Sequence, residues 1–138
     1  MYNKFNLDSI YEYQTFVPSN FPQDLAGNIQ PFFHLDRNYY LLRINFEKEL
    51  AVNFLLNKSE ISDGMELFFI NEAIDGYVGP YTKNILQSSN LSLSGQIRSN
   101  SILVEFSLPI DEFSDIPIDQ IIDDYKLENF RPTNNFKA

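Results

Sequence analysis

The chain has 138 residues, of which 43% are hydrophobic and 15% aromatic, and it contains no cysteine. This length is typical of one domain with its own core, and the composition excludes a disordered chain. The lack of cysteine excludes disulfides, thiolate metal sites and thiol catalysis. We therefore expect a single globular domain over residues 1–138.

The charge is strongly negative, with 19 Asp and Glu against 10 Lys and Arg and a formal net charge of −9. Nucleic-acid backbones and acidic membrane surfaces attract clustered Lys and Arg, so neither partner is expected. A basic protein partner would suit this charge, although ordinary solubility explains it just as well. No apolar run could form a signal-peptide core or span a membrane, so we expect a cytoplasmic protein.

The first part of the chain, residues 1–38, is irregular and rich in aromatic residues and proline. Aromatic and β-branched residues concentrate from Ile10 to Val17, which predicts one strand there, and Pro18 ends it. His34 is the only histidine of the chain. Because no nucleophile motif accompanies it, we interpret His34 as a locally bonded residue at a turn or strand end.

Residues 39–108 show the period-two alternation that is typical of antiparallel strands. The first two runs, 39–46 and 50–56, predict a hairpin with a short turn at Glu47-Lys48. A buried strand over Met65 to Ile70 precedes a turn at Asp75-Gly76. Two further strands, 91–97 and 102–108, are predicted to meet at a turn at Ser99-Asn100.

After Pro109 the period changes, and apolar residues fall at the spacing i, i+3, i+4 and i+7, at Ile118, Ile121, Ile122 and Tyr125. This spacing predicts one amphipathic helix over 115–128, followed by a tail over 129–138. The predicted fold class is mainly β (α+β): an antiparallel sheet or sandwich with one C-terminal amphipathic helix packed against it.

The polar residues of this segment are unusually acidic. Residues 111–128 hold seven acids against Lys126 alone, and a helix would stack Asp119 over Asp123 and Asp124 over Glu128. Each such like-charge pair destabilises a helix by a few tenths of a kcal/mol, so stability does not explain it. The segment is therefore either a charged docking surface or a solvated face. As a docking surface it would bind a partner through Asp111, Asp115, Asp119, Asp123, Asp124 and Glu128.

The chain carries no pattern typical of an enzyme or of a cofactor site. Its five glycines are too dispersed to form a phosphate-binding loop. We expect no catalytic residue, no metal ligand set and no cofactor, and we interpret the protein as a binding protein.

In its size, acidity, lack of cysteine and Asn/Ile/Phe-rich composition, the chain resembles bacterial immunity proteins of toxin–immunity pairs, including those of contact-dependent inhibition systems. The resemblance implies an inhibitor whose acidic surface covers the basic active-site cleft of a cognate toxin, such as a nuclease.

A second resemblance concerns about half of the chain. Asp63 to Phe69, then Ile102 to Leu108 and Pro109 to Phe113, are similar to the strand order and strand ending of family-9-like carbohydrate-binding modules. It implies a β-sandwich that stacks sugars on aromatic rings. Since the chain has no tryptophan, Tyr77 and Tyr81 would take that role. A phage or structural assembly subunit is a third hypothesis.

Overall fold

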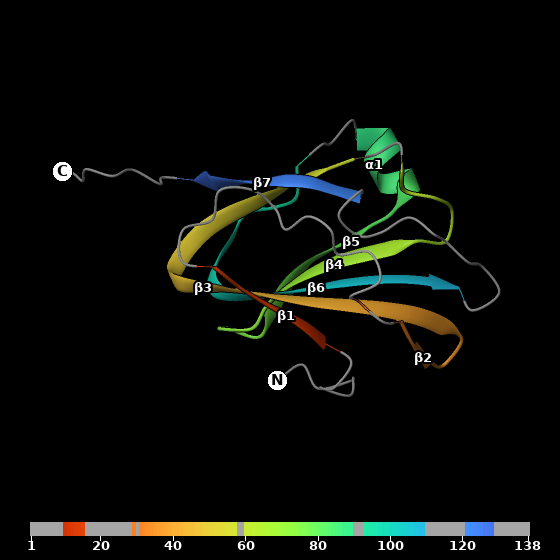
Figure 1. Ribbon diagram of the computed structural model, residues 1–138. Helices are drawn as coiled ribbons and strands as arrows, with labels where there is room; N and C mark the ends of the chain where they lie inside the picture. The colour runs from red at the N-terminus through yellow and green to blue at the C-terminus, as the bar shows by residue number, and fades with distance from the viewer. Residues whose placement is uncertain are drawn as a thin grey trace.

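The computed structural model describes residues 10–15, 29, 31–57, 60–89, 93–109 and 121–128. Over these residues, seven strands form one sheet, and a single short helix accompanies it (Figure 1). The elements are β1 (Ile10–Thr15), β2 (Phe32–His34), β3 (Arg37–Leu56), β4 (Glu66–Asn71), β5 (Gly76–Tyr81), α1 (Lys83–Ser89), β6 (Ile97–Pro109) and β7 (Ile122–Glu128).

The sheet is mixed rather than purely antiparallel. Its main path is β1-β3-β6-β4-β5, and β2 and β7 also pair with β3. The pairing of β1 with β3 is parallel, whereas the other pairings are antiparallel. The prediction of an antiparallel sheet is thus wrong for β1, which was itself predicted as a strand. The segment between Thr15 and Phe32 is long enough for the crossover that a parallel pair requires.

β3 is one continuous strand of 20 residues, so the predicted hairpin with a turn at Glu47-Lys48 is wrong. The strand bends instead, and its pairing with β6 shifts register between Asn45 and Leu50. Residues 47–49 are exposed at this bend and include no Gly, Asn or Pro that would favour a reversal. The apolar alternation predicted on both sides of the bend is confirmed, because both sets face the core: Leu42, Ile44 and Phe46 before the bend, and Leu50, Val52, Phe54 and Leu56 after it.

β6 also continues through Ser99-Asn100, so the predicted turn there is wrong, and of the predicted strand over 91–97 only Ile97 belongs to β6. The Ser99 hydroxyl accepts a hydrogen bond from the Ser101 amide at 3.0 Å and donates one to the Ser101 carbonyl at 2.9 Å. Because Ser99 pairs with Leu50, the bend in β6 lies beside the bend in β3. The two long strands therefore curve together, which Figure 1 shows at the left of the view.

The predicted C-terminal amphipathic helix is not observed: its second half, from Ile122 to Glu128, is strand β7, antiparallel to the second half of β3. Residues 110–120 lie outside the described residues. A strand forms here because β-branched and aromatic residues such as Ile122 and Tyr125 favour strands, and because the second half of β3 offers backbone groups for pairing. Residues four positions apart share one face of a strand but lie about 13 Å apart along it, so the close like-charge contacts of a helix do not arise there.

The described helix, α1, begins where no helix was predicted. The Thr82 hydroxyl accepts a hydrogen bond from the Ile85 amide at 3.3 Å, which caps the first turn. The predicted strand over Met65 to Ile70 is confirmed as β4 and the turn at Asp75-Gly76 as the β4–β5 turn, where Asp75 has a φ of 58°.

The core lies inside the curve of the sheet. Phe54, from the second half of β3, stacks on Phe69 of β4 with ring centroids 4.2 Å apart. Leu42, Val104 and Phe106 belong to the same buried cluster. Since Phe54 and Phe69 come from parts of the sheet that lie on either side of the bend, their contact closes the sheet over its own inner face.

Candidate functional sites

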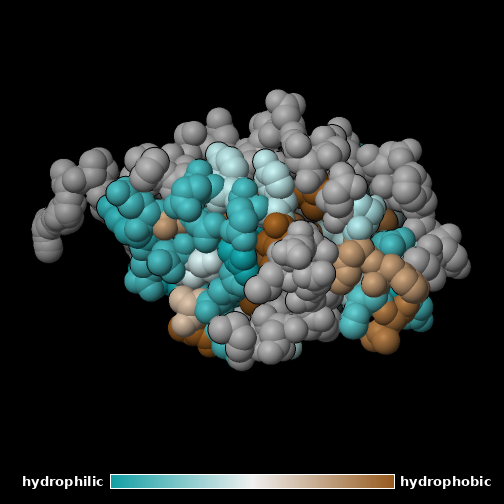
Figure 2. Space-filling view, turned by 60° about the horizontal axis from the view of Figure 1, so that its bottom comes forward, coloured by the Kyte–Doolittle hydropathy of each residue, from teal (hydrophilic) through white to brown (hydrophobic). Residues whose placement is uncertain are grey.

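The tip of the β2–β3 hairpin presents apolar side chains to solvent. Leu35 and Asp36 form a two-residue loop between the paired residues His34 and Arg37. Leu35 is 76% exposed and Phe33 61% exposed. Leu35 also has a φ of 57°, a conformation that costs an aliphatic residue about 1 kcal/mol. Figure 2, which brings the side of β2 forward, shows hydrophobic surface at the end of the molecule where this hairpin lies.

The hairpin is held at both ends, by Arg37 directly after the loop and by Tyr39 opposite Phe32. The Arg37 guanidinium donates to the Ser107 hydroxyl at 3.0 Å, to the Ser107 carbonyl at 3.2 Å and to the Gly64 carbonyl at 2.6 Å. Phe32 stacks on Tyr39 with ring centroids 5.7 Å apart, and burial raises the pKa of Tyr39. His34 packs edge-on against the same ring at 6.1 Å, at the end of β2 as predicted. The apolar tip is therefore carried by a fixed support.

The structure places only part of the predicted acidic surface. Asp124 is half-buried on β7, opposite Leu55. Asp123 and Glu128 lie on the same strand, and their side chains are outside the described part of the structure. The remaining predicted binding residues, Asp111, Asp115 and Asp119, also lie outside the described residues. In the sequence this acidic segment begins two residues after Pro109, and Pro109 pairs with Arg37, the residue that follows the hairpin loop.

A groove of about 220 Å³ lies at the other end of the sheet, around the β4–β5 turn and the start of β6. Tyr77 lines it, is 66% exposed and packs edge-on against Phe68, with centroids 5.6 Å apart. Ile74 adds apolar surface, and Gln96 and Arg98 add polar groups from β6 and the residue before it. Tyr77, Gln96 and Arg98 are thus among the residues that line the groove.

Tyr81, the second residue predicted to stack on a sugar, is placed differently. Its side chain is 9% exposed and packs 6.0 Å from the Phe69 ring in the core. Its hydroxyl accepts a hydrogen bond from the Gly95 amide at 2.8 Å. Tyr81 therefore supports the wall of the groove from inside, whereas Tyr77 presents its ring to solvent.

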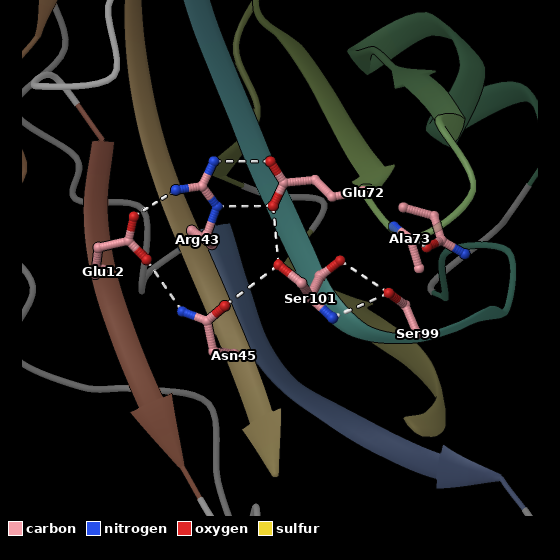
Figure 3. A network of polar contacts seen from close by, with 8 residues as sticks. Glu12, Arg43, Asn45, Glu72, Ala73, Ser99 and Ser101 are labelled. Carbon is pink, nitrogen blue, oxygen red and sulfur yellow. Dashed lines mark hydrogen bonds and ion pairs between the residues drawn. The ribbon is translucent and has the colours of Figure 1, made fainter. Parts of the chain in front are cut away.

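A network of polar side chains crosses the outer face of the sheet (Figure 3). The Arg43 guanidinium forms a bidentate ion pair with Glu72, at 2.7 Å and 2.8 Å, and a second ion pair with Glu12 of β1. Asn45 donates to Glu12 at 3.0 Å, and the Ser101 hydroxyl lies 2.9 Å from a Glu72 carboxylate oxygen. The hydrogen bonds to Glu72 raise the pKa of Arg43 above its usual value. Because the guanidinium sits between the two carboxylates, this cluster ties strands together rather than forming an acid/base pair.

Glu105 is the other ionisable group of note on the outer face. It is 4% exposed on β6, between Leu41 of β3 and Phe68 of β4. Burial among these apolar neighbours raises the pKa of Glu105 to about 7. This carboxyl therefore changes its charge near neutral pH.

Sequence reasoning did not find Phe33, Leu35, Gln96 or Arg98. The segment from Phe32 to Leu35 does carry a signal for Phe33 and Leu35. It places apolar residues at a turn, where polar residues and glycine are usual, so these side chains would lie at the surface. Gln96 and Arg98 gave no such signal, because polar residues that alternate along a strand are usually solvated.

Within the part of the chain that the structure describes, no group of three or more His, Asp or Glu residues could hold a metal ion. Over the same residues, no helix has the length and apolarity needed to cross a membrane. A scan against protein-family models found no match, and a search of curated proteins found no similar sequence.

Proposed function

We propose that this protein is a small acidic inhibitor that binds another protein, in the manner of the immunity proteins that its composition resembles. The observation that carries the proposal is the hairpin tip, where Phe33 and Leu35 are exposed on a rigid support. Exposed apolar side chains on a fixed element are the usual anchors of a protein interface. A leucine held at positive φ suggests a role other than stability.

Charge supports the same proposal. Asp36 is exposed at the tip, and the acidic segment 111–128 starts two residues after Pro109, which pairs with Arg37 next to the hairpin loop. We propose that the tip enters a cleft of the partner and that Asp111, Asp115, Asp119, Asp123, Asp124 and Glu128 contact its basic rim. Opposite charges around an apolar anchor accelerate association and set the orientation of binding. The active-site cleft of a toxin such as a nuclease has this basic character.

The test is capture of the partner from the native host with the tagged full chain, followed by measurements with the purified partner. We expect a basic protein whose activity is blocked by stoichiometric binding. The double variant Phe33→Ala/Leu35→Gly should weaken binding roughly 10- to 100-fold. The association rate should fall steeply as ionic strength rises.

The matched control is Ile74→Ala, because Ile74 is equally exposed, at 74%, but lies in the β4–β5 turn at the opposite end of the sheet (Figure 1). This variant should bind as the wild type does. Equal binding by the hairpin variant would overturn the role of the tip, and an association rate that ignores salt would overturn the electrostatic part. Capture of a coat or scaffold protein with no activity to inhibit would favour the assembly-subunit hypothesis instead.

A second candidate function is carbohydrate binding, which the groove beside Tyr77 favours. The ring is 66% exposed next to an open groove with amide and guanidinium groups, the combination that sugar sites use. A glycan array with the full chain tests this function. The idea fails if no glycan binds, or if Tyr77→Ala binds as well as the wild type.

A further inference from the structure

We infer that ionisation of Glu105 loosens the β2–β3 hairpin, so that the hairpin is held most firmly in mildly acidic solution and opens more often at neutral pH. Glu105 acts through a buried apolar cluster that it shares with the hairpin. A consequence for partner binding rests on the proposed function of the tip. The loosening itself is a property of the free protein and is tested without a partner.

The cluster lies on the outer face of the sheet, on the other side from the main core. Its buried members are Tyr39, Leu41, Ile70 and Leu103, and Phe32 of β2 packs against them. Leu41 and Leu103 are 0% and 1% exposed. We call these residues the outer cluster, and its interior is closed to water.

Glu105 is surrounded by this outer cluster. It pairs with Leu41 of β3 on one side and with Phe68 of β4 on the other, and it is 4% exposed. Burial raises the pKa of Glu105 to about 7. An ionised carboxylate among apolar side chains is costly until it is hydrated, and water reaches this one when part of the outer cluster opens.

The charged and titratable groups around Glu105 come from several strands. Among the described residues on this face they are Arg37, Tyr39 and Arg43 of β3, Glu66 of β4 and Glu72 directly after it, His34 of β2, Glu12 of β1 and Tyr77 of β5. Both arginines already have acceptors. Arg43 lies between Glu72 and Glu12 (Figure 3), and Arg37 donates to Ser107 and Gly64. Ionisation of Glu105 therefore calls for water rather than for one of these cations.

The hairpin is the part of the outer cluster that is held by the fewest backbone pairs. β2 has three residues, and in the described part of the chain it pairs with β3 alone. β1 and β4 have six paired residues each. Phe32 stacks on Tyr39 with ring centroids 5.7 Å apart, and Tyr39 is the neighbour of Leu41 on the same face, diagonal to Glu105. Lifting β2 from Tyr39 is thus the least costly way to admit water to the carboxyl group.

The direction of the effect follows from proton binding. In the closed outer cluster Glu105 has a pKa of about 7, whereas a hydrated glutamate has the ordinary pKa of 4.5. The closed hairpin is therefore favoured most below pH 4.5, and this advantage is lost as the pH rises to about 7. The two pKa values limit the change in the opening equilibrium to roughly 300-fold.

Hydrogen exchange on the free full chain, followed by amide resonances, tests the inference. Protection factors are compared at about pH 5 and about pH 8, because they remove the intrinsic pH dependence of exchange, and low urea separates local opening from global unfolding. We expect the protection of the amides that pair β2 with β3, within residues 32–39, to fall roughly 10- to 100-fold between the two conditions. This exchange should be insensitive to low urea and faster than that of the amides that pair β4 with β6.

Glu105→Gln stays neutral, so its hairpin protection should be the same at both pH values. Two control variants should keep the wild-type response. Glu66→Gln removes another carboxyl group of the same face, and His34→Asn removes the imidazole of the hairpin, since histidine is the side chain that most often changes charge in this pH range.

Equal hairpin protection at both pH values in the wild type would overturn the inference. So would a response that persists in Glu105→Gln or that disappears in His34→Asn. If the hairpin amides exchange with the same protection and urea dependence as those of β4 and β6, Glu105 acts through global unfolding alone and the inference is also wrong. None of these measurements needs a partner, so failure to find one would count against the proposed function and not against this inference.

Discussion

Arg43 and Glu72 form a bidentate ion pair that joins the middle of β3 to the β4–β5 turn, two positions that are 29 residues apart in the chain. Both side chains are largely buried, with 20% and 17% of their surfaces exposed. An ion pair in such a place is sensitive to the loss of one partner, because the other is left with an uncompensated charge.

Arg43→Met should therefore destabilise the fold, by about 2 kcal/mol, since both Glu72 and Glu12 lose their cation. Urea denaturation measures the change in the free energy of unfolding. Lys48→Met, at the exposed bend of the same strand, should change it by less than about 0.5 kcal/mol. Similar values for the two variants would contradict the structural role of the network.

Glu105 should make stability fall as pH rises through neutrality. Its pKa is raised from 4.5 to about 7 in the folded state, so the folded state holds the proton more tightly than the unfolded state. The contribution of this group to stability is fully present below pH 4.5 and is lost as pH rises to about 7.

Glu105→Gln removes that pH dependence. The variant should be more stable than the wild type by about 1 to 3 kcal/mol at pH 8, and the two should converge as pH falls below 5. Thermal unfolding across this pH range measures the difference. Glu47→Gln is the control, because Glu47 is exposed at the bend of β3. A constant gap between Glu105→Gln and wild type at all pH values would refute the expected titration.

Leu35→Gly should stabilise the fold by up to about 1 kcal/mol, although it removes a large side chain. The φ of 57° costs leucine more than glycine, and the side chain is 76% exposed, so little packing is lost. The midpoint of chemical denaturation of Leu35→Gly, compared with that of the wild type, measures this change in stability. A loss of stability would mean that the Leu35 side chain packs in solution and is not the exposed tip proposed for partner binding.

Phe54→Ala should destabilise the fold by about 3 to 5 kcal/mol, because it removes a fully buried ring that stacks on Phe69. This contact depends on the bend of β3, since a straight strand would not return over β4. Calorimetry measures the loss, and Phe33→Ala, at an exposed position, should cost well under 1 kcal/mol. Comparable losses would argue against closure of the sheet through Phe54.

The alternation of apolar residues was sufficient to predict the inner faces of β3, β4 and β6, because burial requires apolar side chains on one face whatever the partner. The same pattern could not distinguish a hairpin from a bent strand. Leu42 and Val52 point inward in both cases, and the difference depends on whether β6 continues alongside the bend. The parallel pairing of β1 with β3 could not be predicted from the alternation either, because it depends on where the chain returns to the sheet after a long connecting segment.

Near the C-terminus the sequence allowed two answers. Ile122 and Tyr125 fit one face of a helix, yet β-branched and aromatic residues also fit a strand, and pairing with β3 decided between the two. The acidic character of residues 111–128 was determined by sequence alone, whereas the position of Asp123, Asp124 and Glu128 on β7 was not.

Tyr77 and Tyr81 show, for single residues, the same difference between what the sequence predicts and what the tertiary structure decides. Four positions apart, they would share one face of a regular strand, and the sequence treats them alike. An irregularity in the pairing of β4 with β5 lies between them, so that Tyr77 pairs with Ile70 on the outer face while Tyr81 pairs with Leu67 over the core. Composition alone determined that the protein is acidic and cysteine-free, and the alternation of apolar residues predicted that it is rich in strands. Tertiary structure decided which side chains solvent or a partner can reach, because exposure depends on pairing register and on the bend of two long strands.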